Sequence, residues 1–531
     1  MTALAADAPA SEPATPTGSR LQRLTSSLGR ACVLSAAAGV ALALAFPPVG
    51  IWVLAPIAVA VLLVVQRRAT VASSGRRTAV VGALTGGSFG LTFFALLTPW
   101  LLVIGPDAYA LIVVMSTGFV ALFGAGAVFI LRLGGWPLWV ACWWVAVEAL
   151  RDRIPLGGFP WGRIGHSQVD APTAAWVSVG GVPVLGFVVV LVAGLFAWAV
   201  LAAATRRTLP ALLVGASACA VLFSGLAIPT ETMGREVTVA VVQGNVPDTG
   251  LDAFGRREAV LDAHVTATHE LADRVRSGEI AQPDVVFWPE NASDIDPSLD
   301  ESAFAAIHAA VADIGVPVLV GMVVETDGGK HVANQGTVWN PTDGPGDTYV
   351  KQHLVPFGEY VPMRDLLDAF ISRLDRIPRD FVAGTASGVL DTGPVTVADT
   401  ICYDVAYDSA VREAVADGGE VITVQTNNAT YGETAQVDQQ WAISRLRALE
   451  HGRTVVVAST SGISGIVDPD GTVVTRAPEF EQATIVEPIL ATTDMTVATR
   501  AGAWPEAVLA AAGAVALLVA GVRRRTGRRP T

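Results

Sequence analysis

The chain is short of charged residues and has almost no lysine. Asp, Glu, Lys and Arg make up 16% of its 531 residues, and 52% are apolar. Because soluble domains carry about 25% charged residues, this composition excludes an ordinary soluble protein. Lysine occurs only at positions 330 and 351, against 33 arginines. Lys330 lies in a turn-like Gly-Gly-Lys run and is interpreted as an ordinary surface residue. Lys351 ends a predicted strand, where a function can require a compact, titratable amine.

Cysteine and histidine are also scarce, with four and seven residues. The histidines are scattered, and no Cys/His group has the spacing of a zinc site. No P-loop or GxGxxG run follows a predicted strand. We therefore expect no metal and no nucleotide cofactor. Cys32, Cys142 and Cys219 lie in long apolar runs, so Cys402 has no disulfide partner within its own segment.

The charges that do occur are unevenly distributed. Residues 231–500 hold 41 acidic and 17 basic side chains, whereas residues 1–230 hold 6 acids and 13 arginines. This division indicates a membrane part followed by a soluble part. The acidity of the soluble part argues against nucleic acid as a partner.

Long apolar runs fill the first part of the chain and return once near its end. Most approach the roughly 20 residues that a spanning helix needs, although the first, second and fifth are short. We therefore predict about eight transmembrane helices. The segments are 31–46, 49–65, 78–98, 108–131, 135–150, 176–203, 209–228 and 503–522.

Arginines lie in every second connection between these segments, which predicts that both termini are cytoplasmic. The connection 151–175 is the exception, with Arg151, Arg153 and Arg163. The predicted organisation is a disordered cytoplasmic tail at 1–30, a seven-helix transmembrane domain at 31–228, an extracytoplasmic α/β domain at 229–500, a transmembrane helix at 503–522 and a basic cytoplasmic tail at 523–531.

Residues 236–490 alternate short β-branched runs with amphipathic stretches, which is typical of an α/β domain. Predicted strands lie near 237–243, 284–288, 316–323, 333–339, 394–401, 421–425, 454–459 and 464–467. Predicted helices lie near 251–276, 300–314, 405–416 and 434–451.

Reactive side chains follow three of the predicted strands. One strand ends at Cys402, just before a helix, and a helix N-terminus favours the reactive thiolate. Glu290 follows a buried strand, and Lys351 and Glu359 lie in a Pro/Gly-containing loop after another. Taken singly, Cys402 is typical of a buried structural cysteine, and the glutamates and the lysine are typical of ordinary surface charges.

Together these residues define a chemistry. A thiol nucleophile needs a base, and Glu290 can take its proton and return it to the leaving group. The oxyanion of a tetrahedral intermediate needs a cation or N–H donors, which Lys351 and the backbone N–H of Tyr403 can supply. The pattern therefore predicts nucleophilic catalysis by Cys402.

Glu290, Lys351 and Cys402, in this order and at strand ends, resemble the Glu-Lys-Cys triad of the nitrilase, or carbon–nitrogen hydrolase, superfamily. Further runs resemble one branch of it, the apolipoprotein N-acyltransferases. These runs are Val242-Gln-Gly-Asn-Val-Pro247, Trp288-Pro-Glu290, Lys351–Pro362, Ile401-Cys-Tyr403, Arg445-Leu-Arg-Ala-Leu-Glu450 and Gly158-Phe-Pro-Trp161.

The resemblance implies a nitrilase-like αββα sandwich domain above a bacterial cell membrane that the chain crosses several times. It implies ping-pong acyl transfer without a cofactor: Cys402 takes the sn-1 acyl chain of a phospholipid as a thioester. The α-amine of the diacylglyceryl-cysteine of an apolipoprotein then accepts it.

The resemblance also implies supporting roles for further residues. Glu359 would assist the triad or hold Lys351, and Tyr403 would shape the acyl pocket. Asp404 stands where many members have glutamate, and Asn427 begins a run that differs from the usual one; both lie around the substrate pocket. The loop that carries Trp161 is a candidate lipid entry site.

Two alternative functions use the same motifs. One is a membrane-tethered amidase or nitrilase, for which eight spans are more than a tether needs. The other is a non-enzymatic membrane scaffold for a partner such as a glycosyltransferase.

Gly86-Gly-Ser88-Phe-Gly90 matches the GxSxG pattern of serine hydrolases but lies within a predicted span, where small residues favour helix packing. The sequence leaves open whether residues 363–386 form a lid.

Overall fold

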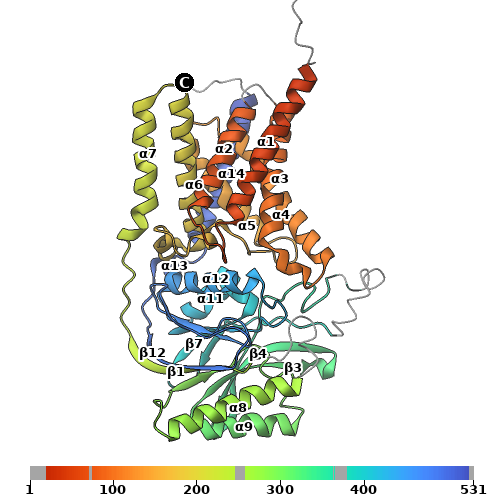
Figure 1. Cartoon of the computed structure of the whole chain (residues 1–531), viewed down its shortest axis with the longest axis vertical. Helices are drawn as coiled ribbons and strands as arrows, with labels where there is room; N and C mark the ends of the chain where they lie inside the picture. The colour runs from red at the N-terminus through yellow and green to blue at the C-terminus, as the bar shows by residue number, and fades with distance from the viewer. Residues whose placement is uncertain (1–19, 71–74, 246–256, 363, 365–378, 526–531) are drawn as a thin grey trace, which may run out of the picture.

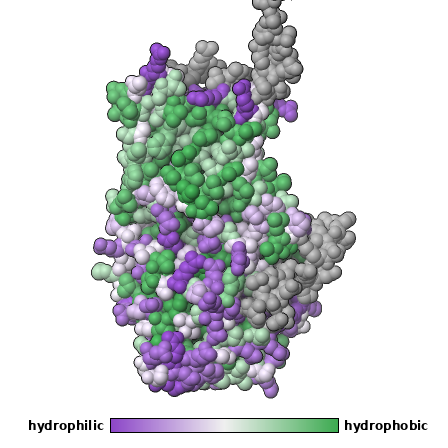
Figure 2. All heavy atoms as spheres, viewed as in Figure 1, coloured by the Kyte–Doolittle hydropathy of each residue, from purple (hydrophilic) through white to green (hydrophobic). Residues whose placement is uncertain are grey.

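The structure is a computed structural model that describes residues 20–70, 75–245, 257–362, 364 and 379–525. It has two parts, a bundle of apolar helices and an α/β domain below it in Figure 1. Figure 2 shows a predominantly apolar surface over the bundle and a mixed, largely polar surface over the α/β domain. Of residues 363–386, the candidate lid, residues 363 and 365–378 lie outside the described part, as do residues 1–19.

Each of the eight predicted apolar segments forms a helix. Five described helices are long and apolar enough to cross a membrane, at Arg76–Leu97, Pro106–Ile130, Ala174–Ala204, Thr208–Ala227 and Trp504–Arg524. The three short predicted segments correspond to α1, α2 and α5, so the number of eight spans stays a prediction. The helices are α1 (Arg20–Ala43), α2 (Leu54–Ala69), α3 (Arg76–Leu97), α4 (Pro106–Ile130), α5 (Trp136–Arg151), α6 (Val177–Ala204), α7 (Thr208–Phe223) and α14 (Trp504–Arg525).

The prediction of a disordered tail at 1–30 is wrong for its last part. Helix α1 begins at Arg20, so residues 20–30 are helical. Leucines at positions 21, 24 and 28 recur with helical spacing and continue the apolar run that follows them.

The GxSxG run lies within α3 and serves packing, as predicted. A β-carbon on Gly86 would come within 2.5 Å of the carbonyl oxygen of Val120, and one on Gly90 within 2.7 Å of the Val120 side chain. The hydroxyl of Ser88 donates to the carbonyl of Leu84 in its own helix at 2.8 Å. Small residues thus let α3 and α4 approach closely.

The α/β domain contains two six-stranded sheets within the described residues. Their strand orders are β12-β1-β2-β3-β4-β5 and β11-β10-β9-β8-β7-β6. The strands β1, β2 and β3 run parallel, as do β7, β8 and β9. The strands are β1 (Arg235–Gln243), β2 (Val285–Phe287), β3 (Val318–Thr326), β4 (His331–Asn340), β5 (Gly344–Val350), β6 (Val389–Asp391), β7 (Thr396–Ile401), β8 (Val421–Thr426), β9 (Val455–Ser459), β10 (Gly465–Val467), β11 (Val473–Arg476) and β12 (Ala483–Ala491).

Four helices cover the outer faces of the two sheets, which confirms the predicted αββα sandwich. Helices α8 (Arg257–Arg276) and α9 (Glu301–Ile314) cover the first sheet, and α11 (Asp408–Ala416) and α12 (Ala435–His451) cover the second (Figure 1). Helix α9 begins where Asp300 accepts hydrogen bonds from the N–H groups of Ser302 and Ala303. Helix α12 packs against α6 of the bundle, so the second sheet and its helices lie next to the membrane part.

Candidate active site

The three residues of the predicted triad lie directly beyond strand ends. Glu290 follows β2 after the buried Trp288, whose indole N–H donates to the hydroxyl of Thr268 at 3.0 Å. Lys351 follows β5, and Cys402 follows β7. Glu290 and Lys351 follow strands of one sheet, and Cys402 follows a strand of the other. The site therefore combines residues from the strand ends of both sheets.

A buried ammonium group lies between two carboxylates. The Nζ atom of Lys351 is 3.2 Å from Oε1 of Glu290 and 2.7 Å from Oε1 of Glu359. The Lys351 side chain is 1% exposed, so water screens neither contact. The geometry matches the predicted role of Glu359 in holding Lys351.

The remaining oxygens of both carboxylates are also hydrogen-bonded. The backbone N–H of Asn427 donates to Oε2 of Glu290 at 2.7 Å, and that of Val355 donates to Oε2 of Glu359 at 2.7 Å. Asn427 therefore contacts the site through its backbone. Both carboxylates are fixed by backbone groups and by the ammonium.

Asn334 is a member of the cluster that the sequence analysis missed. It lies on β4, and its Nδ2 donates to Oε1 of Glu290 at 2.6 Å and to Oε1 of Glu359 at 3.4 Å. A signal was present, because a polar residue stands within the predicted strand 333–339. Its partners could not be identified without the tertiary structure.

The electrostatics of the cluster follow from burial and mutual attraction. Burial by itself lowers the pKa of Lys351, but the charges of Glu290 and Glu359 bring that pKa well above its usual value. Burial raises the pKa of Glu359, although Lys351 opposes this shift. Lys351 is therefore positively charged at neutral pH, and Glu359 takes up a proton more readily than a carboxyl group in water.

Cys402 adopts an uncommon backbone conformation, with φ of +50°. It is the first residue of the 3₁₀ turn Cys402–Ala406, and its carbonyl accepts a hydrogen bond from Nε2 of Gln440 at 3.2 Å. A left-handed φ in a residue with a side chain costs on the order of 1 kcal/mol and persists where surrounding contacts hold it. The thiol lies close enough to Glu290, Lys351 and Glu359 for their charges to act on it.

The thiol of Cys402 is harder to ionise than the sequence predicted. Burial and the charge of Glu290 raise its pKa to about 12, although Lys351 and a hydrogen bond with Thr426 act in the opposite direction. The expectation that the helix N-terminus favours a thiolate is therefore wrong, because the low polarity around the buried sulfur outweighs that effect. At neutral pH the sulfur carries its proton until a base removes it.

Asp404 holds the nucleophile turn to the Lys351 loop. Its Oδ2 accepts from the hydroxyl of Tyr349 at 2.8 Å, and its Oδ1 accepts from the backbone N–H of His353 at 2.8 Å. Its side chain is fully buried. Asp404 thus links the turn that carries Cys402 to the segment that carries Lys351, and both of its carboxylate oxygens accept hydrogen bonds.

Aromatic side chains from both domains meet beside the thiol. Trp161, in the loop after α5, stacks on Tyr403 with ring centroids 6.3 Å apart. Trp100, in the turn Pro99–Leu102 after α3, packs edge-on against Tyr431 and Trp161, each at 5.5 Å. The contacts of Trp161 with Tyr403 and Gln439 show that its loop packs against the α/β domain. We call Trp100 and Trp161 the aromatic wall.

Arg163, one of the three arginines that broke the predicted charge pattern, forms buried ion pairs at the domain junction. Arg163 contacts Asp152 at 3.1 Å and Asp408 of α11 at 2.7 Å. Arg447 of α12 contacts Asp408 at 2.8 Å, and its Nε donates to the carbonyl of Val405 at 2.9 Å. These pairs join the 151–175 connection to the turn that carries the nucleophile. The sequence analysis did not identify them.

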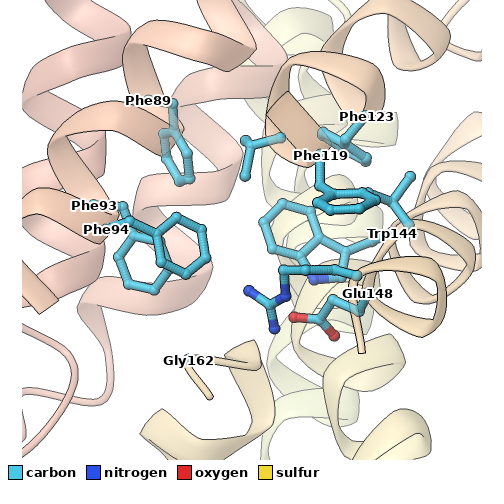
Figure 3. Close-up of a pocket in the computed structure, with 11 residues that line it drawn as sticks. Phe89, Phe93, Phe94, Phe119, Phe123, Trp144, Glu148 and Gly162 are labelled. Atoms are coloured by element: carbon cyan, nitrogen blue, oxygen red, sulfur yellow. The ribbon is translucent and has the colours of Figure 1, made fainter. Parts of the chain in front are cut away.

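A separate cavity lies within the helical bundle (Figure 3). It lies between α3, α4, α5 and the loop that carries Gly162. Aromatic rings such as Phe94, Phe123 and Trp144 line it, together with the charged side chains of Glu148 and Arg151. No member of the predicted triad lines it.

An αββα domain with a glutamate, a lysine and a cysteine beyond its strand ends, joined to a bundle of apolar helices, defines a membrane-embedded carbon–nitrogen hydrolase. Residues 238–500 match the carbon–nitrogen hydrolase family. Residues 38–195 match the apolipoprotein N-acyltransferase N-terminal domain. The chain belongs to the apolipoprotein N-acyltransferase family.

Curated relatives support this assignment along the whole chain. The apolipoprotein N-acyltransferase of Mycolicibacterium smegmatis is 41% identical over 93% of this chain and 86% of its own length. That of Pseudomonas paraeruginosa is 30% identical over 90% of this chain and 93% of its own length. The protein is thus a bacterial membrane enzyme of the acyltransferase class.

Two solved structures of the nitrilase superfamily are similar to about half of this chain. An amidase from Nesterenkonia AN1 covers 52% of this chain and 97% of its own, with 17% identity and a TM-score of 0.38. Nit3 of Saccharomyces cerevisiae covers 48% of this chain and 90% of its own, with 16% identity and a TM-score of 0.35.

Proposed function

We propose that this chain transfers an acyl chain from a phospholipid to the α-amine of the N-terminal S-diacylglyceryl-cysteine of lipoproteins, through a thioester on Cys402. One observation carries the proposal above all. The charges of a Glu–Lys–Glu cluster act on the Cys402 thiol, and Tyr403 and Tyr431 beside it pack against an aromatic wall that the membrane domain contributes. A site with this composition suits a substrate that is held in the bilayer by its acyl chains.

In the first half-reaction, Sγ of Cys402 attacks the sn-1 ester carbonyl of the phospholipid. Glu290 takes the thiol proton as the C–S bond forms, which the raised pKa of the thiol makes necessary. The ammonium of Lys351 and the backbone N–H of Tyr403 stabilise the oxyanion. The ester C–O bond then breaks, and Glu290 returns the proton to the oxygen of the departing lysophospholipid.

In the second half-reaction, the α-amine of the diacylglyceryl-cysteine attacks the thioester carbonyl. Glu290 accepts a proton from the attacking nitrogen, and the C–S bond breaks when the intermediate collapses. The proton passes to the sulfur, so Cys402 returns to its thiol form and an amide is released. Both half-reactions thus use one base and one oxyanion site.

The arginine pattern of the sequence supports a topology in which both termini are cytoplasmic and residues 229–500 lie on the extracytoplasmic side of the membrane. In this arrangement the thiol stands at the outer leaflet, where lipoproteins carry their diacylglyceryl group. Cysteine labelling from the two sides of the membrane, with single cysteines introduced at the exposed positions Arg68 and Asp327, tests this topology. Labelling of position 68 from outside would contradict it.

The decisive experiment compares Cys402→Ala with Cys219→Ala, a matched control in membrane helix α7. Wild type and the control are expected to form a thioester with acyl-labelled phospholipid, whereas Cys402→Ala forms none. Mass spectrometry of a lipoprotein from a deletion strain then reads the N-terminal amide. A thioester on the Cys402→Ala protein would refute the nucleophile assignment.

The same variants test the two alternatives. Release of ammonia from small amides without transfer to lipoprotein would favour a membrane-tethered amidase. Rescue of lipoprotein N-acylation by Cys402→Ala would favour a scaffold that acts through a partner such as a glycosyltransferase.

A further inference from the structure

A buried glutamine of α12 connects the two domains beside the site. Gln439 is 4% exposed. Its Oε1 accepts hydrogen bonds from the indole N–H of Trp161 at 2.7 Å and of Trp100 at 3.2 Å. Its Nε2 donates to the carbonyl of Leu97 at 3.0 Å, with a longer contact of 3.5 Å to that of Pro47. One amide thus contacts four residues in three segments of the membrane domain.

The chemistry of these partners determines the orientation of the amide. Indole N–H groups only donate, and backbone carbonyls only accept. The oxygen of Gln439 must therefore face the two tryptophans and its nitrogen the two carbonyls. A buried donor or acceptor without a partner is unfavourable, so the contact fixes the aromatic wall relative to α12.

The next residue of α12 fixes the nucleophile. Nε2 of Gln440 donates to the carbonyl of Cys402 at 3.2 Å and to the hydroxyl of Thr426 at 3.1 Å. Adjacent residues of one helix therefore hold the aromatic wall and the backbone of the nucleophile. Because a helix is stiff over one residue, the separation between the wall and the thiol is set by α12.

We propose that Gln439 is a positioning residue that holds Trp100 and Trp161 at the distance from Cys402 at which the acyl chain of the donor packs against them. The inference rests on the proposed function and adds a determinant of chain-length specificity. The wall faces both aromatic neighbours of the thiol, since Trp161 stacks on Tyr403 and Trp100 packs on Tyr431. A long apolar chain gains contact with such rings, whereas a short chain gains little.

The test compares Gln439→Leu with wild type in thioester formation from dipalmitoyl and dihexanoyl phospholipids. Leucine fills similar space but leaves both indole N–H groups and the carbonyl of Leu97 without partners. For the dipalmitoyl donor, kcat/KM is expected to fall about 10- to 100-fold, mainly through KM, because misplacement by about 1 Å has effects of this size. For the dihexanoyl donor it changes little.

Two controls separate positioning from general damage. Gln66→Leu removes another buried glutamine, on α2, whose Nε2 donates to the hydroxyl of Thr85 at 3.3 Å, and is expected to leave both donors unaffected. Alkylation of Cys402 by iodoacetamide, which has no acyl chain, is expected to proceed in Gln439→Leu as in wild type. If Gln439→Leu does not fold, Trp161→Phe removes the shorter indole hydrogen bond while keeping a ring, and the same chain-length effect is expected.

The outcomes are distinct. Equal losses for both donors, an unchanged kcat/KM for the dipalmitoyl donor, or slowed alkylation would each overturn the positioning role. If wild type forms no thioester with either donor, the proposed function itself fails.

Discussion

Replacing Lys351 by methionine removes the cation that lies between two carboxylates. Its ammonium is 3.2 Å from Glu290 and 2.7 Å from Glu359. At an effective dielectric constant of about 20, each contact corresponds to roughly 5 to 6 kcal/mol of Coulomb energy before desolvation is counted. Loss of one partner of a buried pair lowers stability by about 3 to 5 kcal/mol. Uptake of a proton by Glu359, whose pKa is already raised, moderates this loss.

The effect on the reaction is expected to exceed the effect on stability. Lys351 is the proposed oxyanion donor, and removal of such a donor lowers rates by about 100- to 1,000-fold. Its charge also lowers the pKa of the Cys402 thiol, so the variant makes proton removal harder as well. Thioester formation from labelled phospholipid is therefore expected to fall at least about 100-fold.

The chain supplies its own matched control, because Lys330 is its only other lysine. Lys330→Met changes an exposed residue and is expected to keep both the melting temperature and the rate. An amine-reactive ester is expected to label Lys330 in the folded protein and to leave the buried Lys351 unmodified. A folded Lys351→Met protein that forms thioester at a rate close to that of wild type would refute the assignment of this lysine.

Three further outcomes follow from the charges of the described residues. Alkylation of Cys402 by iodoacetamide is expected to accelerate with pH beyond the usual thiol pKa of about 8.5, since burial raises its pKa to about 12; a plateau near pH 8 would contradict this. Burial also raises the pKa of Asp399 to about 7, whereas an aspartate in the unfolded chain has a pKa of about 4. The folded state therefore binds this proton more tightly, and the stability that the proton contributes below about pH 4 is lost between about pH 4 and pH 7. Asp399→Asn is thus expected to stabilise the folded protein at pH 8 by at most about 4 kcal/mol, which is measured as a higher melting temperature, and to have no effect at pH 3. Equal effects at both pH values would exclude the titration of Asp399 as the cause. Arg163→Met leaves Asp408 with one fewer buried cation and is expected to destabilise the protein by about 3 to 5 kcal/mol, whereas the exposed control Arg207→Met changes stability by less than about 0.5 kcal/mol in thermal unfolding.

Much of the fold was predictable because the strongest constraints act locally. A bilayer requires long apolar runs, and all eight predicted runs are helices in the structure. The central strands β1, β2, β3, β7, β8 and β9 were predicted because they are buried and rich in β-branched residues. The strands β6, β11 and β12 were missed. They lie at or near sheet edges, where Asp391, Arg476 and Pro488 interrupt the apolar pattern.

The predicted site residues fall into two groups in the structure. Glu290, Lys351 and Glu359 form one hydrogen-bonded cluster, as their positions after strands suggested. In the second group, Asn427 contacts Glu290 through its backbone N–H. Asp404 accepts a hydrogen bond from a tyrosine that lies outside the cluster. A sequence pattern identifies the type of side chain, but it does not say which atom of a residue makes the contact.

By itself the sequence determined where the chain can cross a membrane and which residues end its buried strands, since both depend on the order of side chains along a short segment. Only the tertiary structure decided the environment of those residues. It placed Asn334 between two carboxylates, paired Arg163 with Asp408, joined Gln439 to two tryptophans and buried the thiol. Each of these contacts joins residues far apart in the sequence. Burial and charge act through space, so no local pattern could reveal them.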